Sequence, residues 1–233
     1  MDKIPYTLQR SNRKSIGFTI NAEGLKITAP QWVSQAIINQ AIQAKKTWIQ
    51  SKLLQWRQQS PTPTNWQHGM PLPYLGRQII VQLNPQLASC RYEGNYNLAQ
   101  DNDILYINLP STASSHELKS ACTQWFKGRA LAWFETRLHH FGQSSGAKPL
   151  QLRLSSATTR WGSCSANGNI RLNWRLIHLD SDLIDYVIAH ELAHLKEMNH
   201  SSRFWTEVGR ILPGYEAAKH KLKQKSLHTL PIL

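Results

Sequence analysis

Cysteine is scarce in this chain of 233 residues, and its pattern excludes two classes of protein. The three cysteines, Cys90, Cys122 and Cys164, are odd in number and far apart, with no C-x-x-C pair among them. This spacing argues against a disulfide framework and against a cysteine-based zinc cluster. We therefore expect buried, unpaired thiols.

Long apolar runs are missing as well. No stretch of about 18 apolar residues occurs, so the sequence predicts no membrane span and no membrane partner. Residues 1–6 lack the apolar core of a signal peptide, and we therefore expect a cytoplasmic protein. No internal repeat at a fixed period is evident, which argues against a solenoid.

Acidic residues are few. There are 14 of them against 27 lysines and arginines, which gives a formal net charge of +13. Nine of these basic residues, but only the acids Asp2 and Glu23, lie within the first 60 residues. A field of this sign attracts polyanions. We expect a nucleic acid or a nucleotide as a partner, with solubility alone as the alternative.

The expected fold class is α+β. Alternating apolar and polar residues over 4–29 predict a short β-meander, and a long helix is expected over about 32–59. Residues 60–64, Ser-Pro-Thr-Pro-Thr, are typical of a linker. Further strands are expected over 71–83 with a turn or bulge at Gly76, weakly near 90–92, and over 104–109.

Pro110 and the Ser/Thr run after it predict a domain boundary. We expect a β-rich module with one long helix over 1–110, and a catalytic domain over 111–233. The second domain is expected to contain helices over about 115–140, 182–197, 204–211 and 215–225, and strands over 149–154 and 169–177.

The chain is organised around the stretch from His190 to His200, His-Glu-Leu-Ala-His-Leu-Lys-Glu-Met-Asn-His. On a helix, His190 and His194 project from one face and can share one metal ion, and Glu191 emerges beside them. This is the H-E-x-x-H arrangement of zinc hydrolases, in which the glutamate is a base and not a ligand. The flanking residues are apolar all round, which indicates a buried helix whose histidines need partners.

His200 is the expected third ligand, because it follows His194 at the offset of the long metzincin motif. The chain must leave the helix near Asn199 to bring His200 back, and asparagine tolerates the left-handed conformation that this requires. Glu197 and Glu207 are rival third ligands. Cys164 is a weaker candidate still, since no second cysteine lies near it.

Three imidazoles leave one position of a tetrahedral zinc ion open for water. Zinc makes hydroxide available near neutral pH, and Glu191 is placed to take the proton. Transition-state stabilisation is assigned less sharply. Arg160, Asn173 and Arg175 flank the expected cleft, and each fits a structural role equally well.

These motifs resemble the YgjP-like family of bacterial metallopeptidases, which is similar to the minimal zincins of the SprT and WLM groups. The resemblance covers nearly the whole chain, most specifically residues 160–205. Its main motifs are Arg160-Trp-Gly-Ser-Cys-Ser165, Leu172-Asn-Trp-Arg-Leu176, the stretch from His190 to His200, and Phe204-Trp205.

The resemblance implies a zincin-like helix–sheet–helix core, zinc ligands at His190, His194 and His200, and Glu191 as the catalytic acid/base. The related minimal zincins include proteases that act on proteins attached to DNA, which would suit the basic charge.

The expected function is therefore a zinc metallopeptidase with a protein or peptide substrate near nucleic acid. Zincins bind extended substrates along an edge strand, and the strand over 170–177 is the candidate. The first alternative is a metal-dependent nucleotide phosphohydrolase of the pyrophosphatase type, although the sequence has no P-loop and no carboxylate cluster for magnesium. The second is a nucleic-acid-binding protein with structural zinc, which the open position and Glu191 disfavour.

Overall fold

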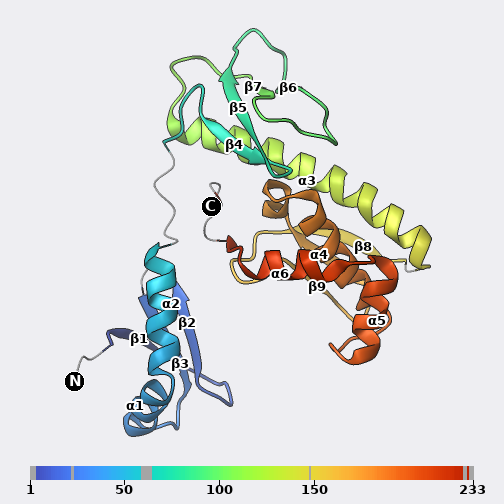
Figure 1. The fold of residues 1–233 in the computed structure, drawn as a ribbon. Helices are drawn as coiled ribbons and strands as arrows, with labels where there is room; N and C mark the ends of the chain where they lie inside the picture. The colour runs from blue at the N-terminus through green and yellow to red at the C-terminus, as the bar shows by residue number, and fades with distance from the viewer. Residues whose placement is uncertain (1–3, 22–23, 59–64, 147, 228–229, 231–233) are drawn as a thin grey trace. The chain divides into compact units, whose positions relative to one another are not determined.

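The computed structural model describes residues 4–21, 24–58, 65–146, 148–227 and 230. The chain forms two compact units, Met1–Thr62 and Pro63–Leu233, and each has its own hydrophobic core. Helices and small sheets are mixed in both, so the predicted α+β class is confirmed (Figure 1). In the part of the chain that the structure describes, no helix combines the length and apolar character needed to cross a lipid bilayer.

The first unit contains a sheet of three strands, β1 (Tyr6–Ser11), β2 (Gly17–Asn21) and β3 (Gly24–Pro30). The strand order is β1-β3-β2, with β1 parallel and β2 antiparallel to β3. The predicted meander is therefore wrong in its pairing. Every second side chain of β3 is buried, and this most apolar strand takes the centre, where both of its edges are hydrogen-bonded.

Two helices follow where one was expected, α1 (Gln35–Ala44) and α2 (Lys46–Gln58). Ser34 caps α1 by accepting a hydrogen bond from the Ile37 N–H at 3.4 Å. The helix breaks at Lys45, where φ is −108° and ψ is 11°. Apolar periodicity continues through the break, because both helices bury isoleucines in the same core.

The second unit begins with four strands, β4 (Pro71–Tyr74), β5 (Arg77–Leu83), β6 (Arg91–Glu93) and β7 (Ile104–Ile107), in the order β4-β5-β7-β6. They are followed by the long helix α3 (Ser115–Ser145). Figure 1 shows β4–β7 against the first half of α3, with later elements of the unit against its second half.

The boundary expected at residue 110 does not coincide with the division between the units. The strands β4–β7 share one core with α3, so they belong to the second unit. The division falls at the linker-like segment, and residues 59–64 lie outside the described part of the chain.

The turn between β4 and β5 contacts the segment that leads into the motif helix. Leu75 and Gly76 both have positive φ, 47° and 78°, in a two-residue hairpin turn. A Cβ atom at Gly76 would overlap the carboxylate of Asp180, so this close approach requires glycine. The Leu75 N–H donates to the carbonyl of Ile177 at 2.8 Å.

The second sheet of this unit contains β8 (Gln151–Ser155), β9 (Gly162–Cys164) and β10 (Asn169–Asn173), in the order β8-β10-β9. The strand expected to continue to residue 177 ends at Asn173 and becomes the 3₁₀ helix η1 (Trp174–His178). All five residues of η1 are buried, which a strand with one face exposed does not allow. Because β10 is central, the expectation that it serves as a substrate-binding edge strand is wrong.

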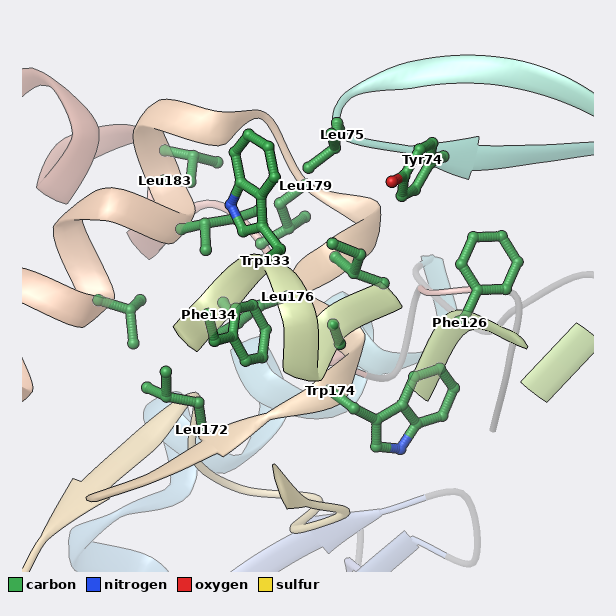
Figure 2. Packing of buried hydrophobic residues seen from close by; sticks show 14 of the residues in the cluster. Tyr74, Leu75, Phe126, Trp133, Phe134, Leu172, Trp174, Leu176, Leu179 and Leu183 are labelled. Carbon is green, nitrogen blue, oxygen red and sulfur yellow. The ribbon is translucent and has the colours of Figure 1, made fainter. Parts of the chain in front are cut away.

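Three helices complete the unit, α4 (Ser181–Ala193), α5 (Ser202–Ile211) and α6 (Tyr215–Lys223). Figure 2 shows the core against which α4 packs, where large side chains from several elements meet. They are Tyr74 and Leu75 of the β4–β5 hairpin, Phe126, Trp133 and Phe134 of α3, Leu172 of β10, Trp174 and Leu176 of η1, and Leu183 of α4. The burial predicted for the motif helix is confirmed.

Candidate active site

Three histidine rings converge where α4 ends. His190 lies in the last turn of α4, His194 is its C-terminal cap, and His200 lies between α4 and α5. Each offers one ring nitrogen, and these three atoms lie within 4.8 Å of one another. The Nε2 atoms of His190 and His200 are 3.1 Å apart. The structure thus brings together the three residues that the sequence predicts as ligands.

The chain leaves α4 earlier than expected. The helix ends at Ala193 rather than near residue 197, and Leu195 and Lys196 form the tighter i+3 bonds that close a helix, each at 3.0 Å. Asn199 does not adopt the expected left-handed conformation. Its side-chain oxygen instead accepts a hydrogen bond from the Ser201 N–H at 3.2 Å, which forms the turn that brings His200 back.

The rival ligands Glu197 and Glu207 do not belong to the candidate metal-binding group. The backbone carbonyl of Glu197 contacts Nδ1 of His194 at 3.0 Å, which fixes the ring with Nε2 facing the other histidines. The Glu207 carboxylate pairs with Arg210 at 2.6 Å and Lys196 at 2.9 Å, and these hydrogen bonds lower its pKa. Among the described residues, the histidines alone form a candidate metal-binding group.

The donor set fits one divalent metal ion. Burial lowers the pKa of His190 to about 3, with smaller contributions from His194, His200 and Lys219, so its imidazole is neutral, as a ligand must be. Two nitrogens bound to one tetrahedral zinc ion lie about 3.3 Å apart. The separation of the His190 and His200 nitrogens is close to this value.

Glu191 lies beside the histidines and is 5% exposed. Burial raises the pKa of its carboxyl group to about 8, and the charge of Arg160 offsets part of this rise. A cavity of about 240 Å³ is lined by Glu191, His190 and Gly162, among other residues. A Cβ atom at Gly162 would lie 2.5 Å from Oε1 of Glu191, so the strand β9 can pass the carboxylate only because this residue is glycine.

The three residues expected near the transition state lie in different environments. Arg160 is exposed, and its charge reaches Glu191. Asn173 is fully buried, and its amide donates to the carbonyls of Ala157 at 2.7 Å and Arg160 at 3.2 Å. The guanidinium of Arg175 is buried 4.8 Å from the ring centre of Trp174. Of the three, Arg160 is the one whose positive charge lowers the pKa of Glu191.

The sequence did not predict which aromatic and basic residues line the site. Trp161 is half-buried and lines two cavities beside His190. Tyr186, Trp205 and Lys219 line the larger of them. Helical periodicity indicates that α5 and α6 are helices, but no sequence signal shows which of their faces meets the histidines. Cys164 is half-buried, burial raises its pKa to about 11, and it does not belong to the candidate ligand group.

A buried helix that presents two histidines and a glutamate, with a third histidine from the turn after it, is an arrangement typical of metal sites in metallopeptidases. The chain belongs to the YgjP-like family, since the family model described as "YgjP-like, metallopeptidase domain" matches residues 14–225. The resemblance inferred from the sequence motifs is thereby confirmed.

A solved structure also matches the chain, "Crystal structure of the metallopeptidase zymogen of Pyrococcus abyssi abylysin". The two are 28% identical, and the match covers 39% of this chain and 92% of the other, with a TM-score of 0.36. No curated protein matched the chain.

Proposed function

We propose that this protein is a zinc-dependent metallopeptidase in which His190, His194 and His200 hold the metal and Glu191 is the general base. The observation that carries the proposal is the convergence of three ring nitrogens within 4.8 Å beside a buried carboxylate, in a chain of a metallopeptidase family. When bound, zinc would polarise the scissile carbonyl and activate water near neutral pH.

Glu191 would take a proton from the attacking water and return it to the leaving nitrogen. A pKa raised to about 8 suits a group that must both accept and release a proton near neutral pH. Gly162 leaves the space in which the carboxylate lies, and the Glu197 carbonyl fixes the orientation of the His194 ring. Arg160 would favour the ionised form of Glu191.

The peptide substrate would bind along β9 rather than along β10. In the described part of the sheet, β9 pairs on one side with β10 and is an edge strand. An extended peptide can add to such an edge through backbone hydrogen bonds. Gly162, at the start of β9, lies against Glu191, so a peptide on this edge would pass the proposed base.

Replacing Glu191 with glutamine tests this function. We expect Glu191→Gln to retain its metal and to lose peptidase turnover by about 100-fold or more, because the amide cannot accept the proton. Glu135→Gln, at an exposed position on α3, is the matched control. Casein and partly unfolded copies of the protein are suitable substrates, and turnover by Glu191→Gln at the control's rate would exclude Glu191 as the base.

The nucleotide phosphohydrolase is the second candidate, and one specific observation favours it. The cavity beside His190 and His200 also contains three lysines, which suit phosphate groups. Nucleoside triphosphates therefore belong in the same assay. Their hydrolysis by the wild type and not by Glu191→Gln, without peptide cleavage, would replace the peptidase proposal.

The proposed nucleic-acid partner has a candidate surface in the first unit. A hollow of about 310 Å³ is lined by Arg13, Lys14 and Trp32, and Trp32 is 75% exposed. Exposed aromatic rings beside cations are typical of single-strand binding. We expect salt-sensitive binding of single-stranded DNA that Trp32→Ala weakens and Trp48→Ala, at another exposed tryptophan, does not. The third candidate, a nucleic-acid-binding protein with structural zinc, gives no role to the buried Glu191.

A further inference from the structure

A hollow of about 630 Å³ opens on one side of the histidines. His190 and His200 are in its wall, so a group bound there would lie next to the proposed scissile bond. The smaller cavity that contains Glu191 shares the wall residues Trp161 and Tyr186 with it. The hollow is therefore placed as a subsite for the part of the substrate that adjoins the reacting group.

Three lysines give this hollow its charge. Lys219 and Lys223 come from α6, and Lys225 follows that helix. Among the residues that the structure describes, no aspartate or glutamate lines the hollow, and none forms an ion pair with any of the three lysines. Lys221, between them in the sequence, is by contrast paired with Asp182 at 3.0 Å. Uncompensated like charges on one wall do not stabilise the fold, so they fit a role in binding an anion.

Aromatic side chains also line the hollow, among them Trp161, Tyr186 and Trp205. The rings of Tyr186, Tyr215 and Trp205 are stacked in series, with centroids 6.1 Å and 5.8 Å apart and interplanar angles of 8° and 9°. His200 stacks on Trp205 at 5.8 Å. Lys219 Nζ lies 3.4 Å from the centre of the Trp205 ring, so the charge is held against this wall. Lys219 also lowers the pKa of His190, after burial and the charges of His194 and His200.

We propose that this hollow is a specificity subsite for an acidic side chain, so that the enzyme prefers peptides with aspartate or glutamate beside the scissile bond. This inference rests on the peptidase proposed above and names its substrate class. Lys219, Lys223 and Lys225 hold the carboxylate, and the rings of Tyr186 and Trp205, which line the hollow, contact the apolar part of the substrate. The edge of β9 and the family of the chain favour a peptide over a nucleotide, whose phosphates carry the same charge.

Binding and cleavage of matched peptides test the subsite. The binding assay uses metal-loaded Glu191→Gln and fluorescent peptides that differ only by Glu or Gln, with this residue moved through each position. We expect about a tenfold preference for the Glu peptide at one position, weakened by salt. The double variant Lys219→Ala/Lys223→Ala, made in the same background, loses the preference, and Lys221→Ala keeps it although it removes charge from the same helix.

Each other outcome overturns the inference. Equal binding of Glu and Gln peptides at every position, or a loss of preference in Lys221→Ala as large as in the double variant, contradicts a local anion subsite. A nucleoside triphosphate analogue that binds through Lys219 and Lys223, when no acidic peptide does, assigns the lysines to phosphate. If the wild type cleaves peptides without a preference for acidic residues, the subsite proposal alone is contradicted. If it cleaves no peptide, the proposal that the protein is a peptidase is contradicted.

Discussion

Uncharged neighbours, namely glycines and backbone carbonyls, determine where the buried ionisable side chains of this protein lie. Gly162 is the clearest case, because β9 passes so close to Glu191 that any Cβ atom would displace the carboxylate. We expect Gly162→Ala to lower turnover by about 10-fold or more, since small misplacements of a catalytic group have large effects. Metal content is expected to stay unchanged, because no ligand is touched.

Gly128→Ala is the matched control for this variant. Gly128 lies within α3, and a Cβ atom there meets nothing within 4 Å. Alanine in a helix interior is expected to raise stability by roughly 0.5–1 kcal/mol and to leave turnover at the wild-type level. Equal turnover of the two variants would mean that Glu191 does not need the position in which Gly162 allows it to lie.

His178 gives the protein a dependence of stability on pH. Its ring is buried, Nδ1 contacts the Pro73 carbonyl at 2.7 Å, and burial lowers its pKa from 6.5 to about 4. Between these two values the unfolded chain binds a proton that the folded chain does not, so stability falls as pH falls from about 6.5 to about 4. Urea unfolding at pH 7 and pH 4.5 should show a smaller loss in His178→Phe than in the wild type. An equal loss would mean that His178 is not held neutral.

At the residue scale, the sequence predicted the chemistry better than its surroundings. The spacing of His190, Glu191 and His194 follows from helix geometry alone, and the offset of His200 predicted a third member that the structure places with them. The contact of the Glu197 carbonyl with His194 could not be predicted, because a backbone group leaves no mark on the residue type. The position of the α6 lysines beside His190 could not be predicted either, because it depends on how α6 packs against α4.

Among the elements, the junction of β10 and η1 depends on Asn173. Its side chain accepts from the Arg175 N–H at 3.1 Å, and its amide holds the segment that leads into β9. We expect Asn173→Ala to lower the free energy of unfolding by about 2–3 kcal/mol, because several buried backbone groups lose their partners. Asn97→Ala, at an exposed position, should change it by less than about 0.5 kcal/mol.

This variant also separates two roles for Asn173. A structural residue lowers stability while turnover per folded, metal-loaded molecule stays near the wild-type value. Loss of turnover without loss of stability would restore Asn173 as a transition-state contact, as its place in the sequence first indicated. Denaturant unfolding and turnover measured on the same preparation decide between the two.

Element types were predicted more accurately than their pairings and ends. Apolar periodicity predicted α3, α4 and most strands, but alternation in β1 and β3 says nothing about which strands pair. The same limit applies to η1, where the Leu-Asn-Trp-Arg-Leu alternation reads as a strand until Asn173 caps a helical turn. The break between α1 and α2 at Lys45 involves no glycine or proline, so the sequence contains no helix-breaking residue from which it could be predicted.

For the whole molecule, the two separate cores predict that the second unit folds by itself. Its core draws on residues between Trp66 and Leu230, and the first unit has a cluster of its own. We expect residues 63–233 to unfold cooperatively on heating and to bind metal as the full chain does. A fragment with a broad transition and no metal would show that the first unit completes the core. The division between the units falls within the linker-like segment Ser-Pro-Thr-Pro-Thr. The proline and the Ser/Thr run at 110 do not mark a division, because a loop within a unit can have the same composition.

Metal content measured by elemental analysis, on protein purified without chelators, tests the metal site most directly. The wild type should contain about one equivalent of a divalent transition metal per chain, because three imidazole nitrogens converge within 4.8 Å of one another. His200→Ala should lose most of that metal in dialysis, and His220→Ala, at an exposed position on α6, should keep it. A wild type without stoichiometric metal, or a His200→Ala variant that retains it fully, would contradict a site built by these three histidines.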